Sequence, residues 1–287
     1  MTDITITNGG VKLAVSVHGP SRAPNVLCLH GISNSRDTWY ETVDRLRDRF
    51  RVWTLDFRGH GHSDRAQRYL VEDYTSDAQA VLDQIGQPTI VVGHSLGAIV
   101  AVRLAQYLNE HIRAVFLEDP PMYLNEKAEW DKTILSKAFP ILRAQQVKLQ
   151  EASADFDAFV EYATNSPAVQ GGVIGDHQTQ RHLDSNGSAL QRNDPNCWEP
   201  ALNMTMLGAM DTSLVLKVPV MLLQADHSLG PALLAGHELR FKQDNPRAEL
   251  VTYAGAPHRI HATAITADRF LDDLDAFVTR HTVSQHR

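Results

Sequence analysis

The sequence predicts an α/β fold in which a mostly parallel central sheet is flanked by helices and carries a helical cap insertion. The chain has 287 residues, a length typical of one large α/β domain that carries an insertion. Short apolar runs alternate with amphipathic runs in its first half, which is the pattern of strands connected by helices. Between residues 122 and 212 this alternation stops. These observations favour one core domain with a cap.

Several short segments have the composition of strands. The first alternates apolar and polar residues, whereas the next ones are continuously apolar. Strands that are apolar on both faces belong in the interior of a sheet that helices cover. The expected strands are 12–17, 26–29, 52–55, 89–92, 114–117, 218–224 and 249–253.

Amphipathic segments between and after these strands predict the covering helices. They are 39–47, 74–85, 96–108, 231–241 and 265–280. In the middle of the chain, residues 144–160 show helical periodicity, and a polar, glycine-containing stretch at 171–196 has no strand-like run. We therefore expect residues 1–121 and 213–287 to form the core, and residues 122–212 to form a helical cap or lid.

The composition excludes several classes of function. The formal net charge is −7, and the chain has no polybasic stretch that would bind phosphate backbones or anionic lipid. No cationic start with an apolar run opens the chain, and no segment is long and apolar enough to cross a bilayer. We therefore expect a cytoplasmic protein with neither a nucleic-acid nor a membrane partner.

Neither the cysteines nor the histidines indicate a metal site. The two cysteines, Cys28 and Cys197, lie far apart in the sequence and suggest neither a disulfide framework nor a thiolate site. The closest histidine pairs lack an accompanying carboxylate pattern such as H-E-x-x-H. We expect no metal and no other cofactor.

The segment GHSLG at residues 93–97 is the strongest chemical signal. It directly follows an apolar strand-like run and opens an apolar helix, which is the context that a G-x-S-x-G nucleophile requires. The glycines let strand and helix pass close together around a strained turn. Ser95 is therefore the candidate nucleophile, and free N–H groups at the helix start would face developing negative charge.

With this motif in place, the sequence resembles the α/β-hydrolase family, and specifically its serine esterases and lactonases. The resemblance extends over nearly the whole chain except the expected cap. The tripeptide LHG at 29–31 is similar to the family's oxyanion loop, and the segment 56–63 is similar to a structural loop after the fourth strand. The resemblance implies an oxyanion hole built by the backbone N–H groups of Ile32 and Leu96. It also implies that a catalytic histidine follows the last strand.

The segment YAGAPH at 253–258 ends the last expected strand and places His258 in that position. Imidazole titrates near neutral pH, so His258 can take the proton of Ser95 and return it to a leaving group. His261, three residues later, is the alternative base. The resemblance favours His258, because the family's base comes first after the small residues.

The acid of the triad has two candidate positions. In the commoner family pattern it lies in a G-x-x-D loop, but here that loop is Ala225-Asp226-His227-Ser228 and Ser228 occupies the expected place. The second family position follows the strand after the nucleophile helix, and Asp119 occupies it. Asp119 is the first candidate and Asp226 the second, with neighbouring Glu118 as a remaining alternative. Whichever acts would orient the imidazole and stabilise its charged form.

The resemblance implies acyl transfer without a cofactor on a small, largely apolar ester or lactone. Cleavage of a carbon–carbon bond, thioester hydrolysis and perhydrolysis use the same catalytic groups, and a hydrolase-fold receptor for a small molecule is a further alternative. Aromatic and apolar residues of the cap could line the substrate pocket or belong to the core. They are Met122, Tyr123, Trp130 and Phe139. Neither the substrate nor the oligomeric state follows from the sequence.

Overall fold

The computed structural model describes residues 1–107 and 110–282. Within these residues the chain forms one eight-stranded sheet in the order β1-β2-β4-β3-β5-β6-β7-β8. The strands are β1 (Thr2–Asn8), β2 (Val11–His18), β3 (Asn25–Leu29), β4 (Arg51–Leu55), β5 (Thr89–His94), β6 (Ile112–Glu118), β7 (Val220–Ala225) and β8 (Glu249–Tyr253). Strands β3 to β8 pair in parallel with their neighbours among themselves, whereas β2 pairs antiparallel with both β1 and β4. The predicted α/β class with a mostly parallel sheet is confirmed.

Strand β1 was not among the predicted strands. It forms a hairpin with β2 through Gly9 and Gly10, whose φ angles are 55° and 87°. A two-residue turn with positive φ at both positions matches the twist of an antiparallel pair, and glycine adopts these angles without strain. The hairpin therefore extends the sheet at its edge.

Two separate apolar cores lie on the two faces of the sheet. Along β3, Val26 and Cys28 belong to one core, whereas Leu27 and Leu29 belong to the other. Successive side chains of a strand point to opposite faces, so a continuous apolar run supplies both cores. The continuously apolar runs thus form buried strands because each strand has helices above and below it.

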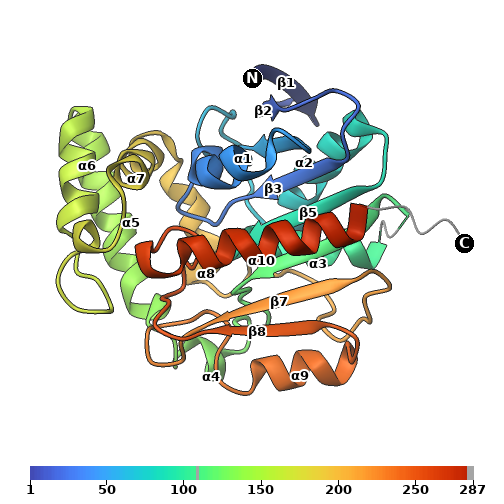
Figure 1. Ribbon diagram of the computed structural model, residues 1–287. Coiled ribbons are helices and arrows are strands. Elements are labelled where there is room, and N and C mark those ends of the chain that lie inside the picture. Colours follow the sequence, from blue (N-terminus) through green and yellow to red (C-terminus); the bar gives the residue numbers. More distant parts are fainter. Residues whose placement is uncertain (108–109, 283–287) are drawn as a thin grey trace, which may run out of the picture.

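Different helices cover these two faces. Helices α1 (Tyr40–Leu46) and α10 (Ala264–Thr282) pack on one face, and both lie in front of the sheet in Figure 1. Helices α2 (Val71–Ile85), α3 (Leu96–Tyr107) and α9 (His237–Asp244) contribute to the core on the other face. A short 3₁₀ helix, η1 (Arg36–Trp39), precedes α1. The predicted last residue of α3, Leu108, lies outside the described residues.

The predicted helix at 231–241 is wrong at its beginning. Helix α9 starts only at His237, after Gly236 with a φ of 91°. The preceding loop is held instead by Asp119, whose carboxylate accepts the backbone N–H groups of Ala232 and Leu233. Hydrogen bonds to a distant side chain, which no local pattern reveals, therefore replace the first helical turn.

A helical segment joins β6 to β7 and stands at one end of the sheet (Figure 1). The predicted helix at 144–160 is wrong in extent, because it is broken around Ser153, which has a φ of 50°. The next helix begins after Asp155, whose side chain caps it. The helices of this segment are α4 (Lys127–Trp130), α5 (Leu135–Glu151), α6 (Phe156–Asn165), η2 (Ile174–Asp176), α7 (Gln180–Arg192), η3 (Pro195–Trp198) and α8 (Glu199–Leu202).

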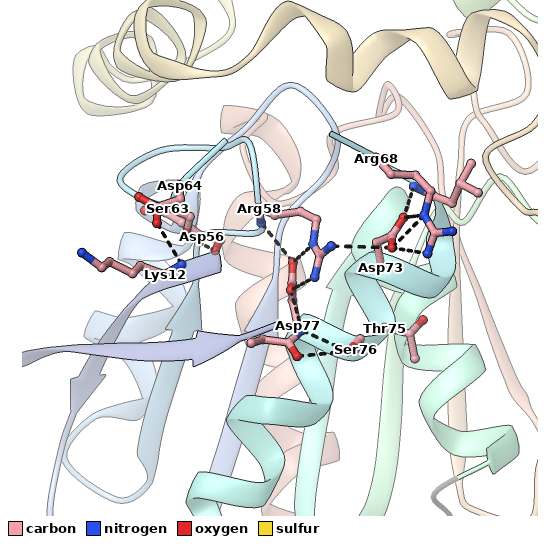
Figure 2. A network of polar contacts seen from close by, with 12 residues as sticks. Lys12, Asp56, Arg58, Ser63, Asp64, Arg68, Asp73, Thr75, Ser76 and Asp77 are labelled. Carbon is pink, nitrogen blue, oxygen red and sulfur yellow. Dashed lines mark hydrogen bonds and ion pairs between the residues drawn. The ribbon is translucent and has the colours of Figure 1, made fainter. Parts of the chain in front are cut away.

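The loop after β4 is fastened to α2 by ion pairs. Arg58 donates two hydrogen bonds to Asp77, at 2.9 and 2.6 Å, and lies 3.6 Å from Asp73. Figure 2 shows Arg58 between these two carboxylates, with Asp56 at the start of the loop. Asp56 is fully buried and accepts the backbone N–H groups of Arg36 and His62. These contacts give the loop a structural role.

Candidate active site

The strand–turn–helix unit around Ser95 is built as the glycine spacing requires. Strand β5 ends at His94, α3 begins at Leu96, and Ser95 between them has a φ of 53°. A Cβ at Gly97 would lie 2.1 Å from the carbonyl oxygen of Leu29, and one at Gly93 would lie 2.3 Å from that of Gly97. Only glycine fits at either place. The strained serine is held at the carboxyl end of the sheet, where functional strain is commonly found.

His258, in the loop after β8, lies beside Ser95. Its Nε2 is 3.0 Å from Ser95 Oγ, within hydrogen-bond reach. Its Nδ1 is 2.6 Å from Asp119 Oδ2, a distance typical of a strong, charge-assisted hydrogen bond. Because a carboxylate only accepts, Nδ1 carries the proton and Nε2 is left to accept one from the serine. The structure thus brings Ser95, His258 and Asp119 into one chain of hydrogen bonds.

Asp119 follows β6 and has a φ of 43°. Its side chain is fully buried, and burial of a carboxylate is costly unless hydrogen bonds compensate it. Oδ2 accepts the N–H of Ala232 at 2.8 Å, and Oδ1 accepts that of Leu233 at 3.2 Å. These donors satisfy the buried carboxylate oxygens and fix the direction in which the carboxylate points.

Asp226 has different partners. Its carboxylate accepts the N–H and Oγ–H of Ser228 and the N–H of Gly255, at 2.6 to 2.9 Å. These hydrogen bonds lower the pKa of Asp226 to about 2. Among the described residues it makes no hydrogen bond to His258. Asp226 joins the loop after β7 to the loop after β8. It therefore supports the loop that carries His258 without contacting the imidazole itself.

Glu118 and His261 form a second buried pair beside the first. The Glu118 carboxylate accepts the backbone N–H of His261 at 2.9 Å and its Nδ1–H at 2.7 Å. On the other side, His261 Nε2 lies 2.8 Å from Thr38 Oγ1, and the ring stacks on Trp39 with centroids 4.6 Å apart. His261 is therefore occupied by contacts with Glu118 and η1 and makes no described hydrogen bond to Ser95. Trp39 itself is buried in the core.

Ile32 and Leu96 line a cavity together with Ser95. Neither backbone N–H donates a hydrogen bond to another described backbone or side-chain acceptor, which leaves both able to bind an oxyanion. The loop after β3 can approach Ser95 closely because Gly31 has no side chain. A Cβ at Gly31 would lie 3.2 Å from the Cβ of Ser95. The carbonyl oxygen of Ile32 is held 2.6 Å from Nε2 of buried His60. The sequence had indicated only a structural role for the loop that contains His60.

Two compartments meet at Ser95. One has an empty volume of about 530 Å³ and a nearly apolar lining that includes Trp130 and Phe139. The other has an empty volume of about 1030 Å³ and is lined by His258 and Arg259 as well as apolar groups. Met122 and Tyr123 line neither compartment and are buried in the core. All four of these residues pack in the core, and two of them, Trp130 and Phe139, also reach the cavity.

Other kinds of site are not found in residues 1–107 and 110–282. No group of three or more His, Cys, Asp or Glu side chains there has the arrangement of a metal site. Cys28 and Cys197 are free thiols in that part of the chain, and burial raises the pKa of both. None of the described helices is both long and apolar enough to cross a membrane.

Comparison with known proteins places these features in a family. The model of the α/β hydrolase fold family matches residues 24–264. Lipase LipV of Mycobacterium tuberculosis is 33% identical over 116 residues, which cover 40% of this chain and 44% of that protein. The 2-(acetamidomethylene)succinate hydrolase of Mesorhizobium japonicum is 31% identical over 119 residues, which cover 41% of this chain and 43% of that protein.

The solved structure of the enol-lactonase from Burkholderia xenovorans is similar with a TM-score of 0.71 over 96% of this chain and 100% of that one, at 20% identity. A sequence identity of 20% is evidence of a shared fold and of nothing more specific. The chain matches 40 to 58% of the length of the first curated relatives. The family match spans most of the chain and includes the glycine-flanked serine, the histidine after the last strand and the parallel strands β3 to β8. This chain therefore belongs to the α/β hydrolase fold family.

Proposed function

We propose that this protein is a serine hydrolase that cleaves a carboxylic ester or a lactone of a small substrate with a large apolar part, through an acyl-enzyme on Ser95. The observation that carries the proposal is the continuous chain of hydrogen bonds from Ser95 Oγ through His258 to Asp119. It opens on a cavity with an almost entirely apolar lining. An apolar pocket with a few converging polar groups is the usual form of a small-molecule site.

In this mechanism Ser95 attacks the carbonyl carbon while His258 Nε2 takes its proton. The backbone N–H groups of Ile32 and Leu96 stabilise the oxyanion, an interaction that is stronger in the transition state than in the bound ester. His258 then gives its proton to the leaving oxygen, and the acyl-enzyme forms. A water molecule, activated by the same imidazole, hydrolyses the acyl-enzyme and frees Ser95.

We assign the acid of the triad to Asp119. Its hydrogen bond to Nδ1 would hold the imidazole in the productive tautomer and stabilise the imidazolium during proton transfer. Asp226, the second candidate from the sequence, would instead hold the two loops together, in accordance with its hydrogen bonds to Ser228 and Gly255. Glu118 is already engaged by His261.

We further propose that residues 122–212 act as the cap. Trp130 and Phe139, both from this segment, contribute to the apolar lining beside Ser95. Closure by apolar side chains excludes water and strengthens the electrostatic interactions with the oxyanion. The acyl group of the substrate would occupy this compartment.

The experiment is to measure hydrolysis of phenyl butyrate together with labelling by an organophosphonate. We expect turnover and a covalent adduct on Ser95, and neither in the Ser95→Ala variant. A folded protein that shows no turnover on a panel of esters and lactones and no Ser95 adduct would refute the proposal.

A further inference from the structure

Arg259 follows His258 directly and lines both the second compartment beside Ser95 and an adjoining cavity that Asn186 also lines. The described lining of this compartment contains no aspartate or glutamate, and Arg259 is its one permanently charged side chain. Two further histidines, His94 and His177, face the same space. The positive charge of the compartment therefore comes from Arg259, and its described lining has no acidic group to balance it.

The guanidinium of Arg259 forms no direct ion pair with a carboxylate in the described part of the protein. Its Nη1 donates to Oδ1 of Asn186 on α7, and no described carboxylate lies within 4.0 Å of it. Burial lowers the pKa of Arg259 to about 10, against the opposing effect of the Glu118 carboxylate. Glu118 itself is engaged by His261.

Most other partly buried arginines have carboxylate partners, and the two without one in the described residues, Arg51 and Arg113, donate to backbone carbonyl oxygens instead. Arg58, Arg36 and Arg103 have side chains that are 11, 13 and 18% exposed, and each lies within 4.0 Å of an aspartate or glutamate. A partly buried arginine without such a partner is costly, because the charge loses hydration and gains no counter-ion. A ligand can supply the missing charge.

We propose that Arg259 binds a carboxylate of the substrate, and that this carboxylate belongs to the leaving group. This inference rests on the proposed function of Ser95 and His258 and adds a chemical class to the substrate: an ester or lactone that is apolar on its acyl side and acidic on its other side. The leaving oxygen must lie next to His258, which protonates it. Arg259, the next residue in the same compartment, is placed to bind what that oxygen carries.

The geometry of the arginine fits this role. Asn186 engages Nη1 and so restrains the guanidinium, whereas Nε and Nη2 have no hydrogen-bond partner among the described residues. Arginine characteristically binds carboxylates through two parallel N–H groups, and lysine does not reproduce that geometry. Restraint of the side chain before binding lowers the entropy cost of capturing the ligand.

A matched pair of esters tests the proposal. The compounds are 3-(butyryloxy)benzoate and 3-(butyryloxy)benzamide, which differ in the charge of one substituent on the leaving group. We expect the wild type to have a kcat/KM about tenfold or more higher for the acid than for the amide, as a charge-assisted pair provides. In Arg259→Met we expect this ratio to approach one, with Arg259→Lys between the two.

Two controls separate charge recognition from structure. Arg22→Met removes an exposed arginine and should leave the ratio as in the wild type. Asn186→Ala removes the contact of Arg259 with α7 and should reduce the ratio while keeping a preference for the acid. If Arg259→Met does not fold, binding of both esters to Ser95→Ala by calorimetry gives the same comparison, with the acid binding about tenfold more tightly.

The outcomes distinguish this inference from the proposed function. Hydrolysis of both esters with no preference for the acid, or a preference that Arg259→Met retains, would overturn the inference and leave the function of Ser95 standing. Absence of turnover and of a Ser95 adduct would overturn both.

Discussion

Replacement of Asp119 by asparagine removes the negative charge next to His258 and keeps the shape of the side chain. In the wild type, Oδ2 accepts from His258 Nδ1 at 2.6 Å and from Ala232 at 2.8 Å, and Oδ1 accepts from Leu233 at 3.2 Å. An asparagine NH₂ in the place of Oδ2 would donate to Nδ1 and face the N–H of Ala232. The imidazole would then carry its proton on Nε2 and could not accept one from Ser95.

In the other orientation, the NH₂ faces the N–H of Leu233 and the productive tautomer survives, but the charge that stabilises the imidazolium is absent. Both orientations leave a buried N–H without an acceptor, which costs about 1–3 kcal/mol of stability. Loss of the acid in Ser-His-Asp enzymes lowers kcat about 10⁴-fold, equivalent to about 5 kcal/mol in the barrier. We therefore expect kcat of Asp119→Asn to fall by about 10³- to 10⁴-fold.

The assay is steady-state hydrolysis of phenyl butyrate, with circular dichroism and thermal unfolding to establish that the variant is folded. Asp226→Asn is the matched control, because it makes the same chemical change in the other candidate acid. We expect this control to retain kcat within a few-fold, because Asp226 makes no described hydrogen bond to His258. Loss of activity in folded Asp226→Asn, or a kcat above one tenth of the wild type in Asp119→Asn, would refute the assignment.

Three further predictions concern the structure around the site. Glu118→Gln weakens the buried pair with His261 and should lower the free energy of unfolding by about 1–3 kcal/mol, measured by urea denaturation; a variant as stable as the wild type would contradict this interpretation. Gly97→Ala places a Cβ 2.1 Å from the carbonyl oxygen of Leu29, so we expect loss of phosphonate labelling at Ser95, and normal labelling would show that the turn tolerates a side chain. Burial lowers the pKa of His30 well below its usual value near 6.5. Below pH 6.5 the unfolded chain therefore binds a proton at His30 that the folded chain does not bind. As a result, the free energy of unfolding is highest above pH 6.5 and decreases as the pH falls. His30→Asn should therefore reduce the slope of unfolding free energy against pH below 6.5 by up to about 1.4 kcal/mol per pH unit in urea titrations, and an unchanged slope would contradict it.

Much of the core was predictable because its signals are local. A strand apolar on both faces, such as β3 or β5, must lie between two helical layers, and both strands are fully buried. The spacing of Gly93 and Gly97 around Ser95 is likewise a steric requirement of a tight strand-to-helix turn, and the Cβ positions at both glycines would clash. Such requirements act over a few residues and can be read directly in the sequence.

The helices of the segment between β6 and β7 were harder to predict. Helix α7 has a polar outer face, and its buried side combines Leu183 and Leu190 with the small or polar residues Ser185, Asn186 and Gly187. Gly187 permits close packing against α6, since a Cβ there would lie 2.6 Å from a methyl group of Val160. Contacts between helices, which the periodicity along a single helix does not reveal, stabilise this part of the chain.

The sequence by itself determined the fold class, the position of Ser95 on its turn and the arrival of a histidine after the last strand, because each depends on residues adjacent in the chain. The choice among Asp119, Asp226 and Glu118 was left open by the sequence. Only the tertiary structure decided which of these carboxylates lies next to His258, because 139 residues separate Asp119 from it along the chain. The tertiary structure also places Arg259 at the compartment beside Ser95 without an acidic partner among the described residues. The sequence could not reveal this, because ion pairing depends on which side chains the fold brings within a few ångströms.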